Sequence, residues 1–414
     1  MAPRVFYGWW VVAAVLVMLS VASGLGFYNL TVFLEALSRE RGFSISSASG
    51  ATALFFAVAG LAGVGVASLV SRYDPRLTIA GGAVVAAAAL ALLGQVGEVW
   101  QLYAVYALFG LGFAGSALVP GTTLVTAWFA RRRSTALSVA TTGLSLGGVV
   151  ITPVCAALIA DRGLAAVAPW LGLAYLVGVL PVTALLVRAR PADLGLHPDG
   201  DPAPLPGAAT GPAGLLRAEA VRTRDFRVIT LVHLLAMAAQ VGALAHVFTL
   251  VAGRLDAVQA GAAVSVIAVS SMLGRLAGGV VLLHVGTRPF AAGLLVLQGG
   301  ALLALGLGER GDVLLPAAAV FGATVGNVLM AHPLLLSEAF GVRDYARIFS
   351  SSNLLATAGT ATGPALLGVL RDATGSYAVS FGAAFAVSLA AAAVLLTLAR
   401  PAAGGPTPGP GVAA

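Results

Sequence analysis

Hydrophobic residues run along nearly the whole chain in long stretches, separated by short polar or turn-rich breaks. The breaks leave twelve segments, each near the roughly 20 residues that a helix needs to cross a bilayer. We predict membrane helices at residues 8–34, 46–70, 77–96, 100–129, 135–160, 166–187, 227–252, 258–283, 289–307, 313–339, 346–370 and 377–399. The pattern therefore predicts an all-α polytopic membrane protein.

The first hydrophobic segment, Gly8 to Leu34, is longer than the roughly 7–15-residue apolar region of a cleaved signal peptide. The single Arg4 before it is a weak basic region for such a peptide. We therefore expect a permanent first helix.

Composition supports a membrane location and argues against an enzyme. Of the 414 residues, 59% are hydrophobic and 9% are charged, whereas soluble domains carry about 25% charged residues. The chain has no lysine, so it cannot contain a phosphate-binding loop ending in Gly-Lys-Ser/Thr. Histidine and cysteine lack metal-ligand spacing, and the single Cys155 excludes an internal disulfide. We expect no cofactor, no metal and no nucleic-acid partner.

The arginines are distributed unevenly between the two sides of the predicted membrane. Loops on the side of the N-terminus hold Arg4, Arg72, Arg76, Arg131, Arg132, Arg133, the cluster Arg188 to Arg227, Arg288, Arg343, Arg347 and Arg400. The other loops hold Arg39, Arg41, Arg162, Arg254, Arg310 and Arg371. This asymmetry matches the positive-inside rule, so we expect both termini to be cytoplasmic, in a bacterial cytoplasmic membrane.

The chain divides into two six-helix halves. We predict an N-terminal bundle at 1–190, a Pro/Gly-rich cytoplasmic linker at 191–226, a C-terminal bundle at 227–400 and a low-complexity, disordered tail at 401–414. The halves echo each other, because helices 5 and 11 both contain small residues at four-residue spacing and both end in an acidic turn. Matching halves of this kind indicate parallel repeats about an axis normal to the membrane.

Several stretches give the chain a family resemblance. They are Tyr7-Gly-Trp-Trp-Val-Val12, Trp128-Phe-Ala-Arg-Arg-Arg-Ser-Thr-Ala136, Arg190-Pro-Ala-Asp-Leu-Gly-Leu-His-Pro-Asp199, and Gly363-Pro364 with Asp372-Ala-Thr-Gly-Ser-Tyr377. With them the chain resembles the major facilitator superfamily over nearly its whole length, and within it the monocarboxylate and oxalate/formate transporter-like branch. The resemblance implies a secondary transporter whose two bundles rock about a central site.

The family's basic gate motif between helices 2 and 3 is similar to Ser71-Arg72-Tyr73-Asp74-Pro75-Arg76. Ser71 stands where the family usually has an aspartate, and Asp74 is the candidate replacement. We expect an inner gate at Arg72, Asp74, Arg76 and Arg133. The arginines at 131–133 could instead contact anionic lipid.

Arg275 is the strongest single candidate for solute binding. It lies inside the eighth predicted helix, and a charge at that depth is costly unless it faces a wet cavity or a partner. A guanidinium can bind a carboxylate through two parallel hydrogen bonds. Alternatively, Arg275 hydrogen-bonds helix carbonyls or extends to the inner interface. The resemblance favours the first reading, because the family has an arginine here that is implicated in carboxylate binding.

Two departures from animal monocarboxylate transporters leave proton coupling open. Those proteins have an aspartate one turn before the arginine, where this chain has Ser271, and a lysine in helix 1 at the place of Tyr28. The remaining candidate proton sites are His246 and His332, since histidine titrates near neutral pH. His233 and His284 are ranked lower, because they lie nearer the inner surface.

Uncharged polar residues complete the predicted site. Tyr28 and Asn29 in helix 1, Gln240 in helix 7 and Asn327 in helix 10 lie on helices that line the central path in the family, and we rank them above Asn353 in helix 11. Each could instead make an ordinary interhelical hydrogen bond.

The favoured interpretation is a carrier of a small organic anion of monocarboxylate type, working alone, with a counter-anion or with a proton. The alternative is an exporter of drugs or secondary metabolites on the same fold. Contacts with membrane lipids are expected in both cases, and the sequence leaves the oligomeric state undefined.

Overall fold

A computed structural model describes residues 6–201 and 214–398. Within these residues, twelve helical spans are long and apolar enough to cross a membrane, as the hydrophobic pattern predicts. The N-terminal six spans comprise α1 (Gly8–Ala22), η1 (Ser23–Tyr28), α2 (Asn29–Arg41), α3 (Ile45–Arg72), α4 (Pro75–Leu93), α5 (Val99–Ser116), α6 (Leu118–Trp128), α7 (Arg133–Leu146), η2 (Gly147–Ile151), α8 (Thr152–Arg162) and α9 (Leu164–Leu186). The C-terminal six are α11 (Arg224–Arg254), α12 (Ala257–Val281), α13 (Thr287–Leu307), α14 (Gly311–Phe340), α15 (Tyr345–Thr374) and α16 (Tyr377–Leu396).

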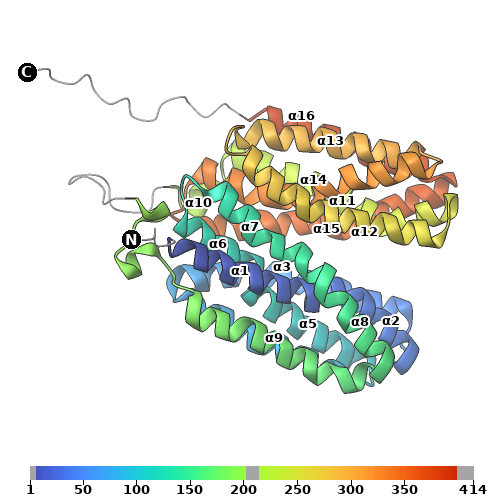
Figure 1. The fold of residues 1–414 in the computed structure, drawn as a ribbon, viewed down its shortest axis with the longest axis horizontal. Helices are drawn as coiled ribbons and strands as arrows, with labels where there is room; N and C mark the ends of the chain where they lie inside the picture. Colours follow the sequence, from blue (N-terminus) through green and yellow to red (C-terminus); the bar gives the residue numbers. More distant parts are fainter. Residues whose placement is uncertain (1–5, 202–213, 399–414) are drawn as a thin grey trace, which may run out of the picture.

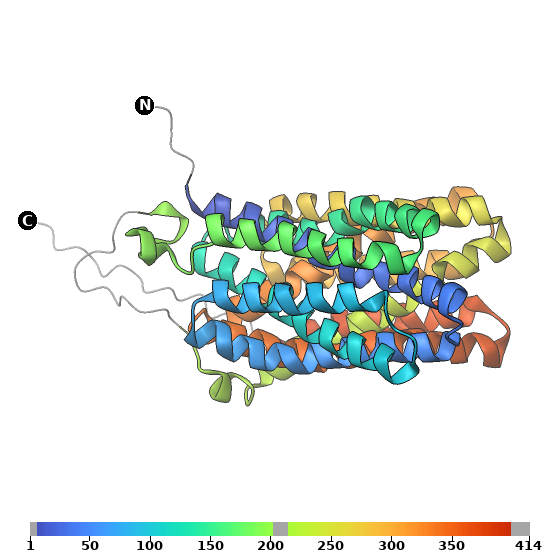
Figure 2. The same cartoon turned by 90° about the horizontal axis from the view of Figure 1, so that it is seen from below.

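The helices run along the long axis of the molecule in two bundles, with α1–α9 forming the lower half of Figure 1 and α11–α16 the upper half. We call the end at which α1 begins and α16 ends the terminal end, and the opposite end, where α2 and α8 finish, the distal end (Figures 1 and 2). All-α architecture in two six-helix bundles is confirmed.

Three of the predicted helices in the N-terminal half are not regular. The fourth span breaks at Ala117, three residues before Pro120, whose missing N–H cannot bond to the Ser116 carbonyl. The first and fifth spans each contain a π-helical segment, η1 and η2, and these two segments pack against each other. Such distortions occur often at functional sites.

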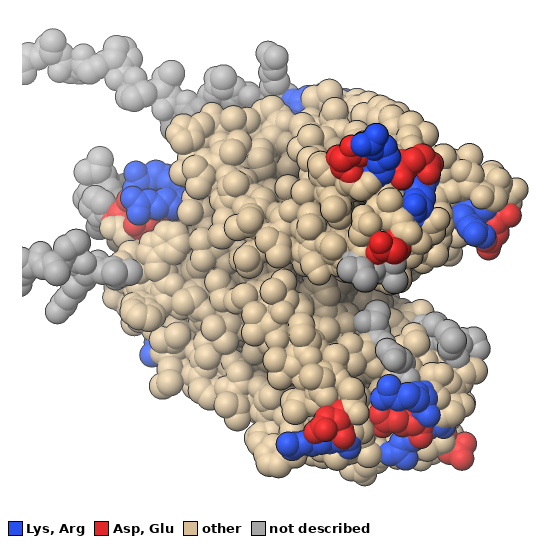
Figure 3. Space-filling view, turned by 45° about the vertical axis from the view of Figure 1, so that its right-hand side comes forward, with Lys and Arg blue, Asp and Glu red and all other residues tan. Residues whose placement is uncertain are grey.

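The two halves meet along α7 with α12 and along α3 with α15. Small residues allow the close approach: a methyl group on Gly279 would lie 2.5 Å from Ser138, and one on Gly60 would touch Leu354 and Thr357. Toward the distal end, α2 and α8 pack mainly on elements of their own half. Figure 3 shows that the surface is hollowed between the halves at this end, with charged side chains gathered on both rims.

The flanks of the predicted linker are folded onto both halves. The Asp199 carboxylate accepts backbone N–H groups of Ala130 (2.9 Å) and Arg131 (2.7 Å) before α7. The Asp344 carboxylate, before α15, accepts the backbone N–H of Arg217 (2.8 Å). Corresponding loops of the two halves are therefore both held by linker residues. The rest of the linker, 202–213, and the predicted tail at 401–414 lie outside the described residues.

Candidate functional site

A cavity of about 230 Å³ lies between the two halves. Its walls come from η1, α3, α5, α6 and α7 on one side and from α11, α12, α14 and α15 on the other. The size suits one small organic molecule. The two walls differ in chemistry, and each is built from different elements.

The N-terminal wall is aromatic. Phe27 and Tyr28 of η1, Phe56 of α3 and Phe113 of α5 line the cavity. The Phe27 ring meets the edge of Tyr28 with 5.1 Å between centroids and that of Phe56 with 5.7 Å. Such edge-to-face pairs hold the rings in defined positions.

The paired π-helical segments position Tyr28. The Ser23 hydroxyl donates to the Leu144 carbonyl (2.7 Å), which ties η1 to the end of α7. The Tyr28 ring packs on Gly148 of η2, where a methyl group would lie 2.8 Å from the ring. Because Gly148 has no side chain, the ring can lie flat against η2 while 37% of the Tyr28 surface stays exposed.

Arg275 is the charged residue of the C-terminal wall, and only 1% of its surface is exposed. Its Nε donates to the Gly326 carbonyl on α14 (2.9 Å) and its Nη1 to the Thr141 carbonyl on α7, in the opposite half. The Ser138 hydroxyl returns a hydrogen bond to the Arg275 carbonyl (2.5 Å). Within the described residues no carboxylate lies within ion-pair distance of the guanidinium.

Gln240 brings an unpaired polar atom to the same wall. Gln240 lines the cavity from α11 and is 2% exposed, and its Oε1 has no hydrogen-bond partner among the described residues. Ser271 and Asn353 also line the cavity. The Ser271 hydroxyl lies 3.3 Å from the hydroxyl of Ser145 on α7, in the opposite half. Buried polar atoms normally find partners, so Gln240 is a candidate ligand for a bound solute.

Two of the predicted binding residues lie away from the cavity lining. Asn29 is fully buried inside the N-terminal half. The Asn327 amide donates to the carbonyls of Gly274 (2.7 Å) and Ala323 (2.8 Å), behind α12. The structure thus brings Arg275, Tyr28 and Gln240 together around one cavity. Asn29 and Asn327 lie apart from them. Asn353, which the sequence analysis ranks lower, also lines the cavity.

The histidines fall into two environments. His246 bonds through Nε2 to the Pro364 carbonyl (2.9 Å) and lies 3.5 Å from the Tyr377 hydroxyl, outside the cavity lining. His332 stacks on His233, and His233 lines the cavity. The sequence analysis ranks His233 below His246 and His332 as a proton site, and of these three His233 is the one that lines the cavity. A signal was available, since it precedes Gln240 by two helical turns on one face of α11.

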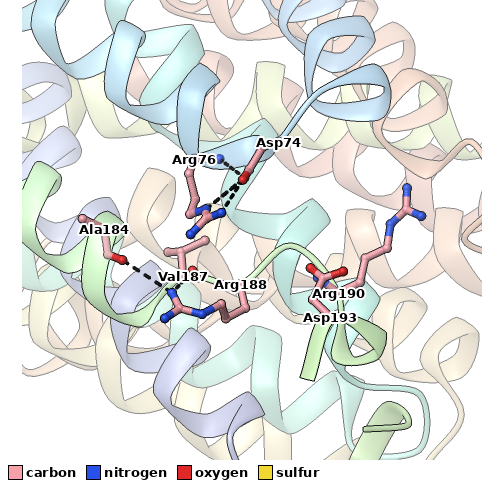
Figure 4. A network of polar contacts seen from close by, with 7 residues as sticks. All are labelled: Asp74, Arg76, Ala184, Val187, Arg188, Arg190 and Asp193. Atoms are coloured by element: carbon pink, nitrogen blue, oxygen red, sulfur yellow. Dashed lines mark hydrogen bonds and ion pairs between the residues drawn. The ribbon is translucent and has the colours of Figure 1, made fainter. Parts of the chain in front are cut away.

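The predicted gate residues at the terminal end divide into two groups. Asp74 pairs with its neighbour Arg76, with 2.6 Å between Oδ2 and Nη2, and caps α4 (Figure 4). Hydrogen bonds from the Arg76 guanidinium hold the pKa of Asp74 below its usual value. Arg72 is exposed. These residues and the nearby Arg188 and Asp193 all belong to the N-terminal half or its linker flank (Figure 4).

Arg133 is the gate candidate that faces the other half. Its Nε donates to the Phe129 carbonyl (2.9 Å). The carboxyl group of Glu338 in the C-terminal half lies close enough to favour the charge of Arg133. Glu338 in turn accepts a hydrogen bond from the Thr287 hydroxyl (2.5 Å). Among the predicted gate residues, Arg133 therefore has the placement that a contact between the halves requires.

Comparison with known proteins agrees with this architecture. The sequence signature of the Major Facilitator Superfamily matches residues 16–308, so the chain belongs to that family. No curated protein sequence matches it. Among solved structures it is similar to the human organic anion transporter MFSD10 (TETRAN), with 16% identity, a TM-score of 0.73, and coverage of 94% of this chain and 99% of that one.

A second similar fold is the fucose:proton symporter FucP of E. coli, with 16% identity, a TM-score of 0.70, and coverage of 93% of this chain and 97% of that one. A structure of FucP in the outward conformation gives a TM-score of 0.69. At this identity the likeness concerns the fold. Fold and family together define a membrane transporter rather than an enzyme.

Proposed function

We propose that the protein carries a small monocarboxylate with an apolar body across the membrane by alternating access. Arg275 holds the carboxylate, and the aromatic wall packs on the body of the solute. The observation that carries this proposal is a buried guanidinium on a cavity wall without a carboxylate partner in the described part of the chain. Likeness of fold does not identify a solute, so the assignment depends on this site.

The hydrogen bonding of Arg275 supports an anionic ligand. A guanidinium has five N–H donors, and the Gly326 and Thr141 carbonyls accept from two nitrogens. Neutral carbonyls leave the positive charge uncompensated. A carboxylate would supply the opposite charge and two acceptor oxygens in the matching planar geometry.

The rest of the lining favours one carboxylate and an apolar remainder. Among the described lining residues, Arg275 is the one that is always cationic, while Phe27, Phe56, Phe113, Met237 and Leu329 present apolar surface. A second carboxylate would lie against this surface unpaired, and burying an unpaired charge is strongly unfavourable. Aromatic or branched monocarboxylates fit both walls.

The arrangement of the halves supports a state open at the distal end, where the surface is hollowed (Figure 3). Arginine is concentrated in the loops of the terminal end, and by the positive-inside rule that end is cytoplasmic. We therefore take the distal end to face outward in a bacterial cytoplasmic membrane. Binding would shift the population between outward-open and inward-open states.

The alternative is an exporter of drugs or secondary metabolites. The apolar lining favours this function for neutral or cationic amphiphiles. The two functions differ in what they require of Arg275, because an exporter of uncharged compounds does not need a carboxylate partner.

The test is uptake of radiolabelled benzoate into proteoliposomes, with uptake by protein-free liposomes subtracted. We expect saturable uptake by wild type, its loss in Arg275→Ala and its retention in Arg371→Ala, which removes an exposed distal arginine. Equal transport by Arg275→Ala and wild type would contradict the anion function. Transport of neutral amphiphiles in place of benzoate would establish the exporter.

A further inference from the structure

Two buried histidines form a stacked pair beside the cavity. The rings of His233 on α11 and His332 on α14 lie 3.8 Å apart between centroids, with 13° between their planes. They are 6% and 3% exposed. Each ring carries two polar nitrogens, and burying such groups in an apolar bundle is costly unless they find hydrogen-bond partners.

The pair is connected to the cavity on one side and to a hydroxyl chain on the other. His233 lines the central cavity together with Arg275. His332 Nε2 lies 2.8 Å from the Ser352 hydroxyl, which lies 2.8 Å from the Thr230 hydroxyl. A proton that reaches His233 from the cavity therefore meets a second imidazole and a short hydrogen-bonded chain.

The described surroundings hold no carboxylate in contact with either ring. His332 contacts the Ser352 hydroxyl and the Phe349 ring, whose centroid lies 5.3 Å from that of His332. The other charged or titratable groups on the packed helices are Arg224, Asp225, Arg227, His246 and Arg254 on α11, Arg275 on α12, Arg288 on α13, Asp312 and Glu338 on α14, and Tyr345, Arg347, Arg371 and Asp372 on α15. Among the described lining residues, His233 is the one with an imidazole, a group that can take up and release a proton.

We propose that the His233–His332 pair is the proton-binding site that couples carboxylate transport to a proton gradient. The site rests on the proposed function, because the bound carboxylate supplies the charge that makes protonation favourable. The pair holds one proton, since two imidazolium charges in contact would repel each other. A proton on the pair and a carboxylate on Arg275 each strengthen binding of the other, as linkage requires.

The charge balance of the cavity supports symport. The empty cavity carries the single positive charge of Arg275, and the cavity loaded with one carboxylate and one proton carries the same charge. The two forms that cross between outward-open and inward-open states are then electrically alike. Each transport cycle moves one anion and one proton together, so no net charge crosses the membrane.

The test uses proteoliposomes with radiolabelled benzoate and an internal pH dye. An acid exterior should raise accumulation by wild type by up to about tenfold per pH unit, since one unit is a tenfold ratio of proton activity. His233→Phe and His332→Phe should lose this stimulation and the linked internal acidification. His332→Phe, which changes a residue outside the cavity lining, should keep benzoate counterflow at equal pH, a mode that needs no net proton movement. His246→Phe, which removes a histidine outside the cavity, should respond as wild type.

A variant that loses counterflow is replaced by the corresponding glutamine variant. A measurement independent of transport follows the imidazole ¹⁵N chemical shifts of the detergent-solubilised protein between about pH 8 and pH 5, where histidine titrates. Benzoate should move protonation of the pair to higher pH. Gradient stimulation that survives in both histidine variants, or stimulation lost in His246→Phe alone, would overturn the site while leaving carboxylate transport intact. Absence of benzoate transport by wild type would overturn the proposed function itself.

Discussion

The two walls of the central cavity differ in the side chains that they present. The N-terminal wall presents aromatic rings, whereas the C-terminal wall presents Arg275, Gln240, His233 and Asn353. Both walls come from six-helix halves of the same architecture. Repeats that share a fold can thus specialise position by position, with one half supplying shape and the other supplying charge and hydrogen bonds.

The difference extends to the backbone. Spans 1 and 5 of the N-terminal half are interrupted by η1 and η2, whereas the corresponding α11 and α15 run as α-helices over 31 and 30 residues. The irregular segments bring Phe27 and Tyr28 to the cavity. The regular helices instead place polar side chains at helical spacing along one face.

The largest expected effect is at Arg275. Arg275→Ala should lower benzoate uptake by about 10²-fold or more, because a charge-assisted hydrogen bond and its ion pairing are both lost. Arg275→Lys should retain part of the activity, since it keeps the charge and loses the planar fork. Uptake kinetics in proteoliposomes measure both. Equal uptake by wild type, Arg275→Ala and Arg275→Lys would show that the charge on the C-terminal wall does not contribute to solute binding.

The aromatic wall should determine selectivity rather than activity as such. Phe56→Ala should reduce the preference for phenylacetate over acetate by about tenfold, since it removes an aromatic contact worth about 1–2 kcal/mol. The acetate rate should change little. Phe248→Ala, which removes an exposed ring outside the lining, serves as the matched control. A loss of acetate and phenylacetate transport in equal measure would argue against a shape-selecting wall.

Gln240 should contribute a smaller and more specific effect. Its unpaired Oε1 can accept a hydrogen bond from a hydroxyl on the solute. Mandelate should therefore compete better than phenylacetate in wild type, and Gln240→Leu should remove about a fivefold difference, near 1 kcal/mol. Competition assays measure the ratio directly. An unchanged ratio in Gln240→Leu would place this oxygen outside solute recognition.

The smallest effect is expected away from both walls, at Asp74. Asp74→Asn should lower stability by at most about 1 kcal/mol at pH 7, because the pair with Arg76 is partly exposed and asparagine can still cap α4. The folded pKa of Asp74 is lowered, so its contribution is present above the unfolded value of about 4 and disappears as pH falls through the folded value. Thermal unfolding in detergent should show a larger difference at pH 7 than near pH 3. If Asp74→Asn altered solute selectivity, residues outside the two cavity walls would also contribute to solute recognition.

The hydrophobic pattern was sufficient for the twelve spans, because each must match the thickness of a bilayer. Arg275 could be singled out for the same reason, since a charge at that depth needs an explanation. The sequence alone could not show whether a polar side chain in a span points into the cavity or toward a neighbouring helix. Asn29 and Asn327 lie at membrane depth but face neighbouring helices. Which way each helix face turns depends on packing between spans that are distant in the sequence.

The π-helical segments have a consequence for the phase of the helices that follow them. A π-bulge accommodates one extra residue in a turn, and one residue corresponds to about 100° of rotation in a regular α-helix. Regular α-helical geometry over the same six residues of η1 would therefore rotate every side chain of α2 about its axis by roughly that angle. Deleting one residue from η1 would instead remove the bulge and leave the faces of α2 where they are. The π-helical turn of η1 therefore determines the direction in which α2 presents its side chains, independently of their identities.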